Sequence, residues 1–87
     1  EAWGIVNRVV EDDRFAAETM ALATELAAGP TLAFGRSKSL LRGGWDESLE
    51  TQMENETQTI SSGAHTADYR EGSAAFFEKR APRFMGE

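Results

Sequence analysis

The sequence predicts a small, mainly α-helical domain with about four helices after a short extended segment at residues 1–10. Apolar residues recur at helical spacing over much of residues 11–87, and glycine and proline divide that stretch into helix-sized pieces. β-branched residues gather only near the start of the chain. We expect a single domain over residues 1–87, because 87 residues rarely make two.

The segment from Gly4 to Val10 is rich in valine and isoleucine, which favours a short strand or an extended conformation. A lone strand cannot satisfy its own backbone groups. We therefore expect this segment either to pair with a strand outside these residues or to lie extended across the helices.

A first helix is predicted from about Arg14 to Ala28, where an apolar stripe and many alanines coincide. Gly29 and Pro30 should end it, with the glycine in the left-handed position after the helix and the proline at the first position of the next. The chain is lean in apolar residues, at 40%, so a partner could be needed to cover such stripes.

The second helix is predicted from about Pro30 to Arg42, and Gly35 inside it suggests a close packing contact. Arg36, Lys38 and Arg42 gather toward its C-terminal half. Cations there complement the helix dipole, which is the ordinary interpretation. An anion-binding patch is the alternative.

A third helix is predicted from about Glu47 to Ser61, capped by Asp46 or Ser48. Its single apolar seam on a polar surface is typical of a helix at the edge of a bundle. Glu50 and Glu54 share a face and could be a catalytic or metal-binding pair. No histidine or second motif converges on them, so we expect a solvated face and no metal site.

The last helix begins at Thr66 as N-cap and carries a stripe that runs from Tyr69 to Arg80. Phe76 and Phe77 lie about 100° apart around a helix, so one is expected in the core and the other toward a groove or partner. Pro82 stops the helix. His65, just before it, is expected to be an exposed loop residue rather than a general base.

Composition excludes several classes. Nine Lys and Arg against 15 Asp and Glu give a net charge of −6, so a nucleic-acid partner is not expected. Zero cysteines exclude disulfides and Cys-ligated metals. No apolar run could span a bilayer and no signal peptide is visible, so we expect a cytoplasmic location and no membrane partner. The chain begins at Glu1 rather than methionine, which suggests a processed or excised piece.

The order of these signals resembles the carboxy-terminal region of the enoyl-CoA hydratase/isomerase (crotonase) family, over nearly the whole chain. The matching positions are Ala2, Gly4-Ile5-Val6-Asn7-Arg8-Val9-Val10, Leu26-Ala27-Ala28-Gly29-Pro30, Lys38, Ser48-Leu49, Glu56, Arg70-Glu71-Gly72, Ala75-Phe76, Glu78-Lys79-Arg80, Pro82 and Phe84. Each motif is weak by itself, but together and in order they indicate the family rather than a particular member.

The resemblance implies that residues 1–87 are a helical C-terminal domain that follows an amino-terminal spiral of ββα units. In the family this region drives formation of trimers, commonly paired into hexamers, and its last helices cover the acyl-CoA site. The oxyanion hole and the acid/base glutamates lie in the spiral domain. The resemblance therefore implies no catalytic residue here, and we do not expect these 87 residues alone to be active.

Two residues carry over as candidate ligands of the coenzyme A moiety of a substrate, and no tightly bound cofactor is implied. Lys79 corresponds to a lysine that approaches the CoA phosphates or adenine end, and Phe76 to a phenylalanine that lines the pocket. Core packing of Phe76 and simple solvent exposure of Lys79 are the alternatives. A tyrosine that some members use is absent, because Ala64 stands in its place. The competing function is a stand-alone helical module that self-associates without catalytic activity.

Overall fold

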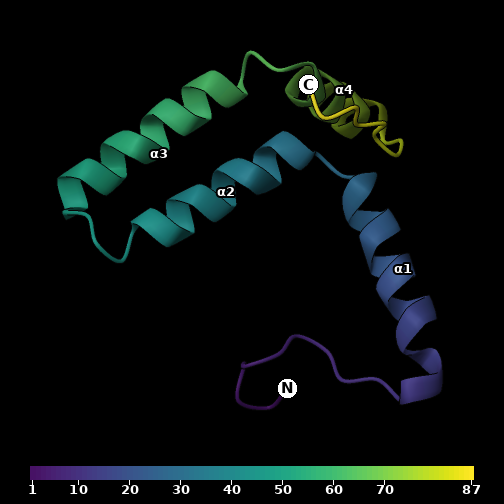
Figure 1. Ribbon diagram of the computed structural model, residues 1–87. Helices are drawn as coiled ribbons and strands as arrows, with labels where there is room; N and C mark the ends of the chain where they lie inside the picture. Colours follow the sequence, from purple (N-terminus) through teal and green to yellow (C-terminus); the bar gives the residue numbers. More distant parts are fainter.

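The computed structural model describes residues 1–87 and contains helices joined by short turns, with no β-strand. One 3₁₀ turn precedes four α-helices (Figure 1). They are η1 (Asp12–Arg14), α1 (Phe15–Ala27), α2 (Thr31–Gly43), α3 (Leu49–Gly63) and α4 (Ala67–Glu78). The predicted helical fold is thus confirmed, with helix ends within a few residues of those expected.

Two of the predicted helix starts are confirmed by side-chain caps. The Ser48 hydroxyl accepts a hydrogen bond from the Thr51 backbone N–H at 3.2 Å and caps α3. The Thr66 hydroxyl accepts one from the Tyr69 N–H at 3.1 Å and caps α4. Each cap satisfies one of the N–H groups that the first turn of a helix leaves without an intrahelical partner.

The helices form an open arrangement rather than a closed bundle. Helices α2 and α3 lie side by side as an antiparallel hairpin, α4 lies at its end, and α1 leads away from it toward the N-terminal segment (Figure 1). The radius of gyration is 16.4 Å, whereas a compact domain of this length has about 12 Å. None of the helices is both long and apolar enough to cross a membrane.

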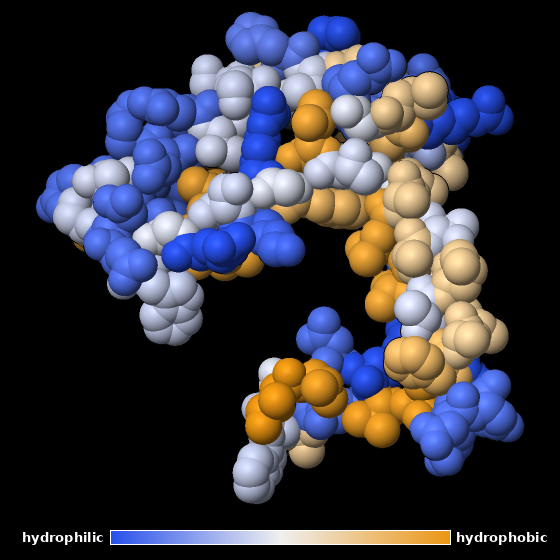
Figure 2. Space-filling view, viewed as in Figure 1, coloured by the Kyte–Doolittle hydropathy of each residue, from blue (hydrophilic) through white to orange (hydrophobic).

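Almost nothing is buried within this arrangement. Only Ala75 and Asp68 are buried, at 1% and 6% exposure. The chain exposes 7529 Å², whereas a monomeric globular protein of its mass exposes roughly 5,000 Å². Apolar side chains surround the open centre, over α1 and the N-terminal segment (Figure 2). The helical stripes predicted from sequence therefore exist, but this chain alone does not cover them.

The N-terminal segment does not form the short strand that the sequence favoured. Residues 1–11 form a turn and bends instead, and Gly4 adopts φ +73° as its N–H donates to the Glu1 carbonyl at 2.9 Å. The β-branched side chains of Ile5 and Val9 remain exposed. A strand needs a partner for its backbone groups, and no other segment of the chain is extended beside this one.

The connection between α1 and α2 also differs from the prediction. Pro30 is the N-cap of α2 rather than its first residue, and Gly29 is not in the left-handed region. Glycine is required at position 29 for space, since a Cβ there would lie 2.6 Å from the Phe34 ring. The prediction of a close packing contact at Gly35 was wrong, because a Cβ there would meet nothing within 4 Å.

Candidate functional site

The C-terminal end of α4 presents two neighbouring aromatic rings to solvent. Phe76 and Phe77 are 79% and 82% exposed, and their rings meet edge to face with centroids 5.7 Å apart. The prediction that one of them enters a core was wrong, because nothing in this chain packs over that side of α4. The two rings line a shallow groove of about 510 Å³ with Tyr69, Gly72 and Ser73.

Lys79 follows these rings and ends the helix in a left-handed conformation, with φ 55° and ψ 39°. Its N–H donates to the Phe76 carbonyl at 3.3 Å, and the Arg80 N–H donates to the Ala75 carbonyl at 3.0 Å. These two bonds define a Schellman motif, which usually places glycine at the left-handed position. The Lys79 side chain is exposed and forms no ion pair within the chain.

Arg80 does not continue the helical stripe that the sequence suggested. Its guanidinium donates to both carboxylate oxygens of Glu71, at 2.6 and 3.0 Å, and to Glu78 at 2.5 Å. Glu71 also accepts the Arg83 backbone N–H at 2.8 Å. The hydrogen bond from Arg80, followed by that from the Arg83 backbone, lowers the pKa of Glu71 to about 2.

Asp68 holds the end of the chain in the same way, one turn earlier on α4. Its two carboxylate oxygens accept the backbone N–H groups of Met85 and Gly86 at 2.7 and 3.0 Å, and its own N–H donates to the Glu87 carbonyl at 2.9 Å. We call Asp68, Glu71 and Arg80 the clasp. The clasp folds residues 81–87 back along α4.

The tail that the clasp holds covers part of α4. A Cβ at Gly72 would lie 3.4 Å from the Phe84 ring, so the ring rests on the glycine backbone. Gly86, at φ +78°, reaches the start of α2, where a Cβ would lie 2.7 Å from the Thr31 hydroxyl oxygen. The sequence did not predict the clasp, because the stripe from Tyr69 to Arg80 placed Arg80 on the helix. The proline-containing tail was the only available signal of a reversal.

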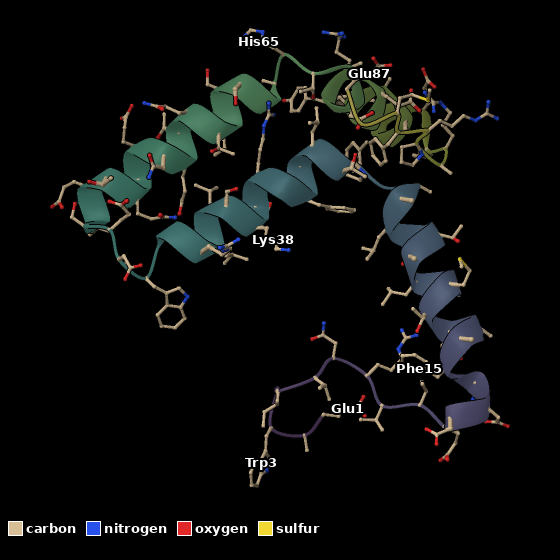
Figure 3. The ribbon with its side chains drawn as sticks, in the orientation of Figure 1. Glu1, Trp3, Phe15, Lys38, His65 and Glu87 are labelled. Carbon is tan, nitrogen blue, oxygen red and sulfur yellow. The ribbon has the colours of Figure 1, made fainter.

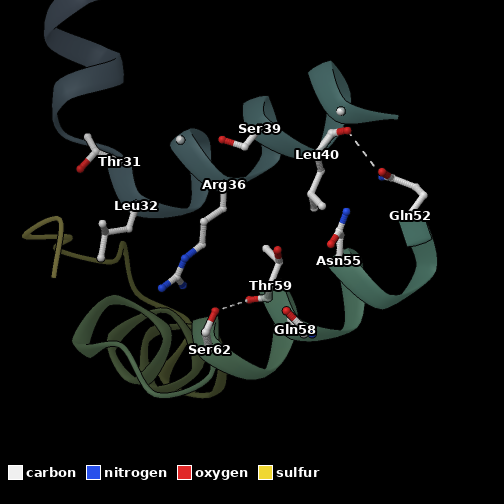
Figure 4. A pocket seen from close by; sticks show the side chains of 12 residues that line it. Thr31, Leu32, Arg36, Ser39, Leu40, Gln52, Asn55, Gln58, Thr59 and Ser62 are labelled. Carbon is white, nitrogen blue, oxygen red and sulfur yellow. Dashed lines mark hydrogen bonds between the residues drawn. The ribbon is translucent and has the colours of Figure 1, made fainter. Parts of the chain in front are cut away.

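The cations of α2 do not converge on one site. Lys38 lies on the side of α2 that faces the open centre (Figure 3) and lines a groove with Arg42 and Trp45. Arg36 instead points across to α3, toward Ser62 (Figure 4). None of the three cations has a carboxylate partner within the chain. Lys38 and Arg42 share one groove, whereas Arg36 lies in another.

The α2–α3 hairpin encloses a polar groove of about 660 Å³ (Figure 4). Gln52 lies in it and donates through its amide nitrogen to the Leu40 carbonyl at 3.5 Å and to Glu56 at 2.9 Å. The amide oxygen of Gln52 is buried without a hydrogen-bond partner. The lining offers hydroxyl, amide and guanidinium groups but no acid/base pair.

The acidic residues of α3 and the single histidine are exposed residues that do not converge on a catalytic or metal site. Glu54 accepts a hydrogen bond from the Gln58 amide at 2.8 Å and stays exposed, as a solvated face should. His65 is exposed, and only its backbone is hydrogen-bonded: its carbonyl accepts from Arg70 at 3.2 Å and its N–H donates to the Ser62 carbonyl at 3.4 Å. No group of three or more His, Cys, Asp and Glu side chains is placed to hold a metal ion. The end of α4 offers a different combination of groups, with the flat apolar rings of Phe76 and Phe77 beside the one cation of Lys79.

Comparisons with known proteins agree with this architecture. Residues 1–87 match the family model described as enoyl-CoA hydratase/isomerase. The chain is 36% identical over 85 residues to a 1,2-epoxyphenylacetyl-CoA isomerase of Escherichia coli K12. It is 34% identical over 77 residues to a 4-chlorobenzoyl coenzyme A dehalogenase of an Arthrobacter species. These matches cover 98% and 88% of the chain but only 32% and 28% of the relatives.

Solved structures share the fold as well as the sequence pattern. An enoyl-CoA hydratase subunit I from Geobacillus kaustophilus HTA426 superposes with a TM-score of 0.88 at 42% identity, over 97% of this chain and 33% of that one. The enoyl-CoA hydratase EchA1 of Mycobacterium marinum gives 0.84 at 30% identity, over 99% of this chain and 35% of that one. The chain thus spans about a third of the length of the proteins it matches, and it belongs to the enoyl-CoA hydratase/isomerase family.

Proposed function

We propose that residues 1–87 are the C-terminal oligomerisation and CoA-site-capping domain of an enoyl-CoA hydratase/isomerase that acts on acyl-CoA thioesters. The parent protein assembles as a trimer or hexamer. Its chemistry, addition of water or movement of a double bond through an enolate held in an oxyanion hole, belongs to a preceding domain. The chain itself supplies apolar helix faces on which the preceding domain and other subunits pack, and it forms one edge of the ligand site. It needs no metal.

The observation that carries the oligomerisation role is the large total surface that the chain leaves exposed, including many large apolar side chains. The chain exposes 7529 Å², which is roughly 2,500 Å² more than a monomer of its mass. A standard interface buries only about 800 Å² on each partner, and permanent complexes bury more. The excess therefore corresponds to more than one interface, as expected if a preceding domain and a second subunit both pack on these helices.

The capping role is supported by the chemistry at the end of α4. Phe76 and Phe77 offer exposed ring faces and edges on which a flat heterocycle can pack. Lys79 adds a cation without a partner in the chain, and an ammonium group forms charge-assisted hydrogen bonds to phosphate. Coenzyme A combines an adenine ring with phosphates. Relatives of the chain carry coenzyme A compounds in their names, among them the 2,3-dehydroadipyl-CoA hydratase of E. coli K12.

A chimera tests both roles together. Residues 1–87 would replace the matching third of the E. coli 1,2-epoxyphenylacetyl-CoA isomerase. We expect the chimera to sediment as a trimer or hexamer and to bind CoA, with Lys79→Met weakening CoA binding about tenfold or more through loss of a charged hydrogen bond. Lys79→Arg, which keeps the positive charge at this position, is the matched control and should retain CoA binding. A monomeric chimera would contradict the oligomerisation role, and equal CoA affinity of the Lys79→Met variant would contradict the capping role.

A stand-alone self-association module is the second candidate, because the same exposed apolar faces could pair between copies of this chain. The two candidates differ in their response to CoA. Titrating CoA into the 87-residue chain while following backbone amide shifts should move Phe76 and Lys79 if the chain caps a CoA site. Concentration-dependent oligomers of the chain with no CoA response in either the chain or the chimera would favour the module.

A further inference from the structure

We infer that Glu71 is a positioning residue that, through Arg80, holds Lys79 in its left-handed conformation and so sets the direction of the Lys79 side chain. The inference rests on the proposed contact between Lys79 and a CoA phosphate and extends it to a residue that touches no ligand. It starts from one backbone outlier. Lys79 is the only residue other than glycine with a positive φ in the chain.

The outlier needs an external cause, because the left-handed region brings the Cβ of an L-residue close to the following carbonyl oxygen. Glycine would occupy this position without strain and is the usual residue in a Schellman motif. A lysine at this position therefore lowers the stability of the fold relative to glycine, and what it adds is a side chain. Strained residues that persist in a structure are held by their surroundings, and they concentrate at functional sites.

Lys79 is held in place by the hydrogen bonds that the next residue, Arg80, forms. Arg80 is fixed at both ends, by its N–H on the Ala75 carbonyl at 3.0 Å and by its guanidinium on both oxygens of Glu71 at 2.6 and 3.0 Å. Glu71 lies two turns earlier on α4, so this pair ties the chain after Lys79 to the helix before it. Glu71 also accepts the Arg83 N–H at 2.8 Å, which extends the restraint into the tail.

The consequence for a ligand is geometric. The φ angle of Lys79 sets the direction of its Cα–Cβ bond relative to the helix axis. If Lys79 relaxed to an ordinary φ, the chain after the helix would take another path and the Lys79 side chain would leave the end of α4 in another direction. A bidentate arginine–carboxylate pair has the directional rigidity that such a restraint needs.

Stability measurements on the chimera test the restraint itself. Glu71→Gln should lower the melting temperature. Lys79→Gly should raise it in the native background, where the restraint holds a strained lysine, and should raise it less in the Glu71→Gln background, where the lysine can relax. Gly35→Ala, in another helix, serves as the control for general stabilisation and should add the same increment in both backgrounds. If Lys79→Gly adds as much in the Glu71→Gln background as in the native background, the restraint is refuted.

Affinity measurements on the chimera test the link to the ligand. Glu71→Gln should weaken CoA binding by about tenfold, as loss of one charged hydrogen bond would, and should leave binding of phosphate-free pantetheine unchanged. In a Lys79→Met background, Glu71→Gln should have no further effect on CoA. Equal losses for CoA and pantetheine, or additive losses in the double variant, would show a merely structural role. If Lys79→Met alone has no effect, the proposed capping role fails; if only Glu71→Gln is silent, this inference fails and the capping role stands.

Discussion

Replacing Asp68 by asparagine should release the C-terminal tail from α4. Asp68 is 6% exposed, and its two carboxylate oxygens accept N–H groups from Met85 and Gly86 at 2.7 and 3.0 Å. Asparagine keeps one oxygen but turns an NH₂ group toward the other donor, so one N–H loses its acceptor. Hydrogen bonds to charged groups are worth about 1.5–3 kcal/mol each, and loss of a negative charge near a helix N-terminus adds about 0.3–1 kcal/mol.

In the chimera, which is about three times as long as this chain, the total predicted loss of about 2–4 kcal/mol corresponds to a fall in melting temperature of about 4–16 °C. Thermal unfolding followed by circular dichroism measures this loss. Amide hydrogen exchange locates it, and exchange should speed up first at Met85 and Gly86. Asp46→Asn is the matched control, because Asp46 is exposed and its side chain forms no hydrogen bond or ion pair. If both variants melt alike and the tail amides keep their protection, the clasp does not hold the tail.

Three further predictions test other parts of the structure. The pKa of Glu71 is lowered from 4.5 to about 2, so its contribution to stability is complete above about pH 4.5 and is lost as pH falls toward 2. The side-chain carboxyl ¹³C shift should titrate near 2, and its pKa should rise toward 4.5 in Arg80→Met without reaching it, because the Arg83 N–H bond remains. Ser48→Ala removes the N-cap of α3 and should cost about 1 kcal/mol in urea unfolding; an unchanged midpoint would contradict the cap. Gly35→Ala should stabilise α2 by up to about 1 kcal/mol, whereas Gly29→Ala should displace the Phe34 ring and bring no such gain, because a Cβ would lie 2.6 Å from that ring.

The sequence predicted the helices well because their signals are local. Helical spacing of apolar residues, the Ser48 and Thr66 caps and the break at Gly29 each depend on a few neighbouring residues, and the structure has helices where these signals place them. The segment from Gly4 to Val10 was less predictable for a physical reason. β-propensity describes the fit of a side chain to a sheet, and this chain contains no second strand with which a sheet could form.

Side-chain environments were predicted less well, because burial depends on what packs against a helix. Phe76 has the pattern of a core residue, yet it is almost fully exposed here. The clasp was missed for a related reason. The ion pair between Glu71 and Arg80 spans nine residues and forms only because the chain reverses after Lys79, and a left-handed lysine is not a recognised helix-ending signal.

The clasp also explains how α4 can keep its shape in a chain with almost no core. The only two buried residues, Asp68 and Ala75, both lie on α4, where the returning tail and its hydrogen bonds lie. The rest of the chain, α1 above all, has an apolar stripe and no counterpart to cover it. Burial is the main favourable term in folding, so α1 needs an outside surface to be stable. Helix α4 carries its own local support, and this lets its other side remain uncovered and free for contact with a ligand or a second subunit.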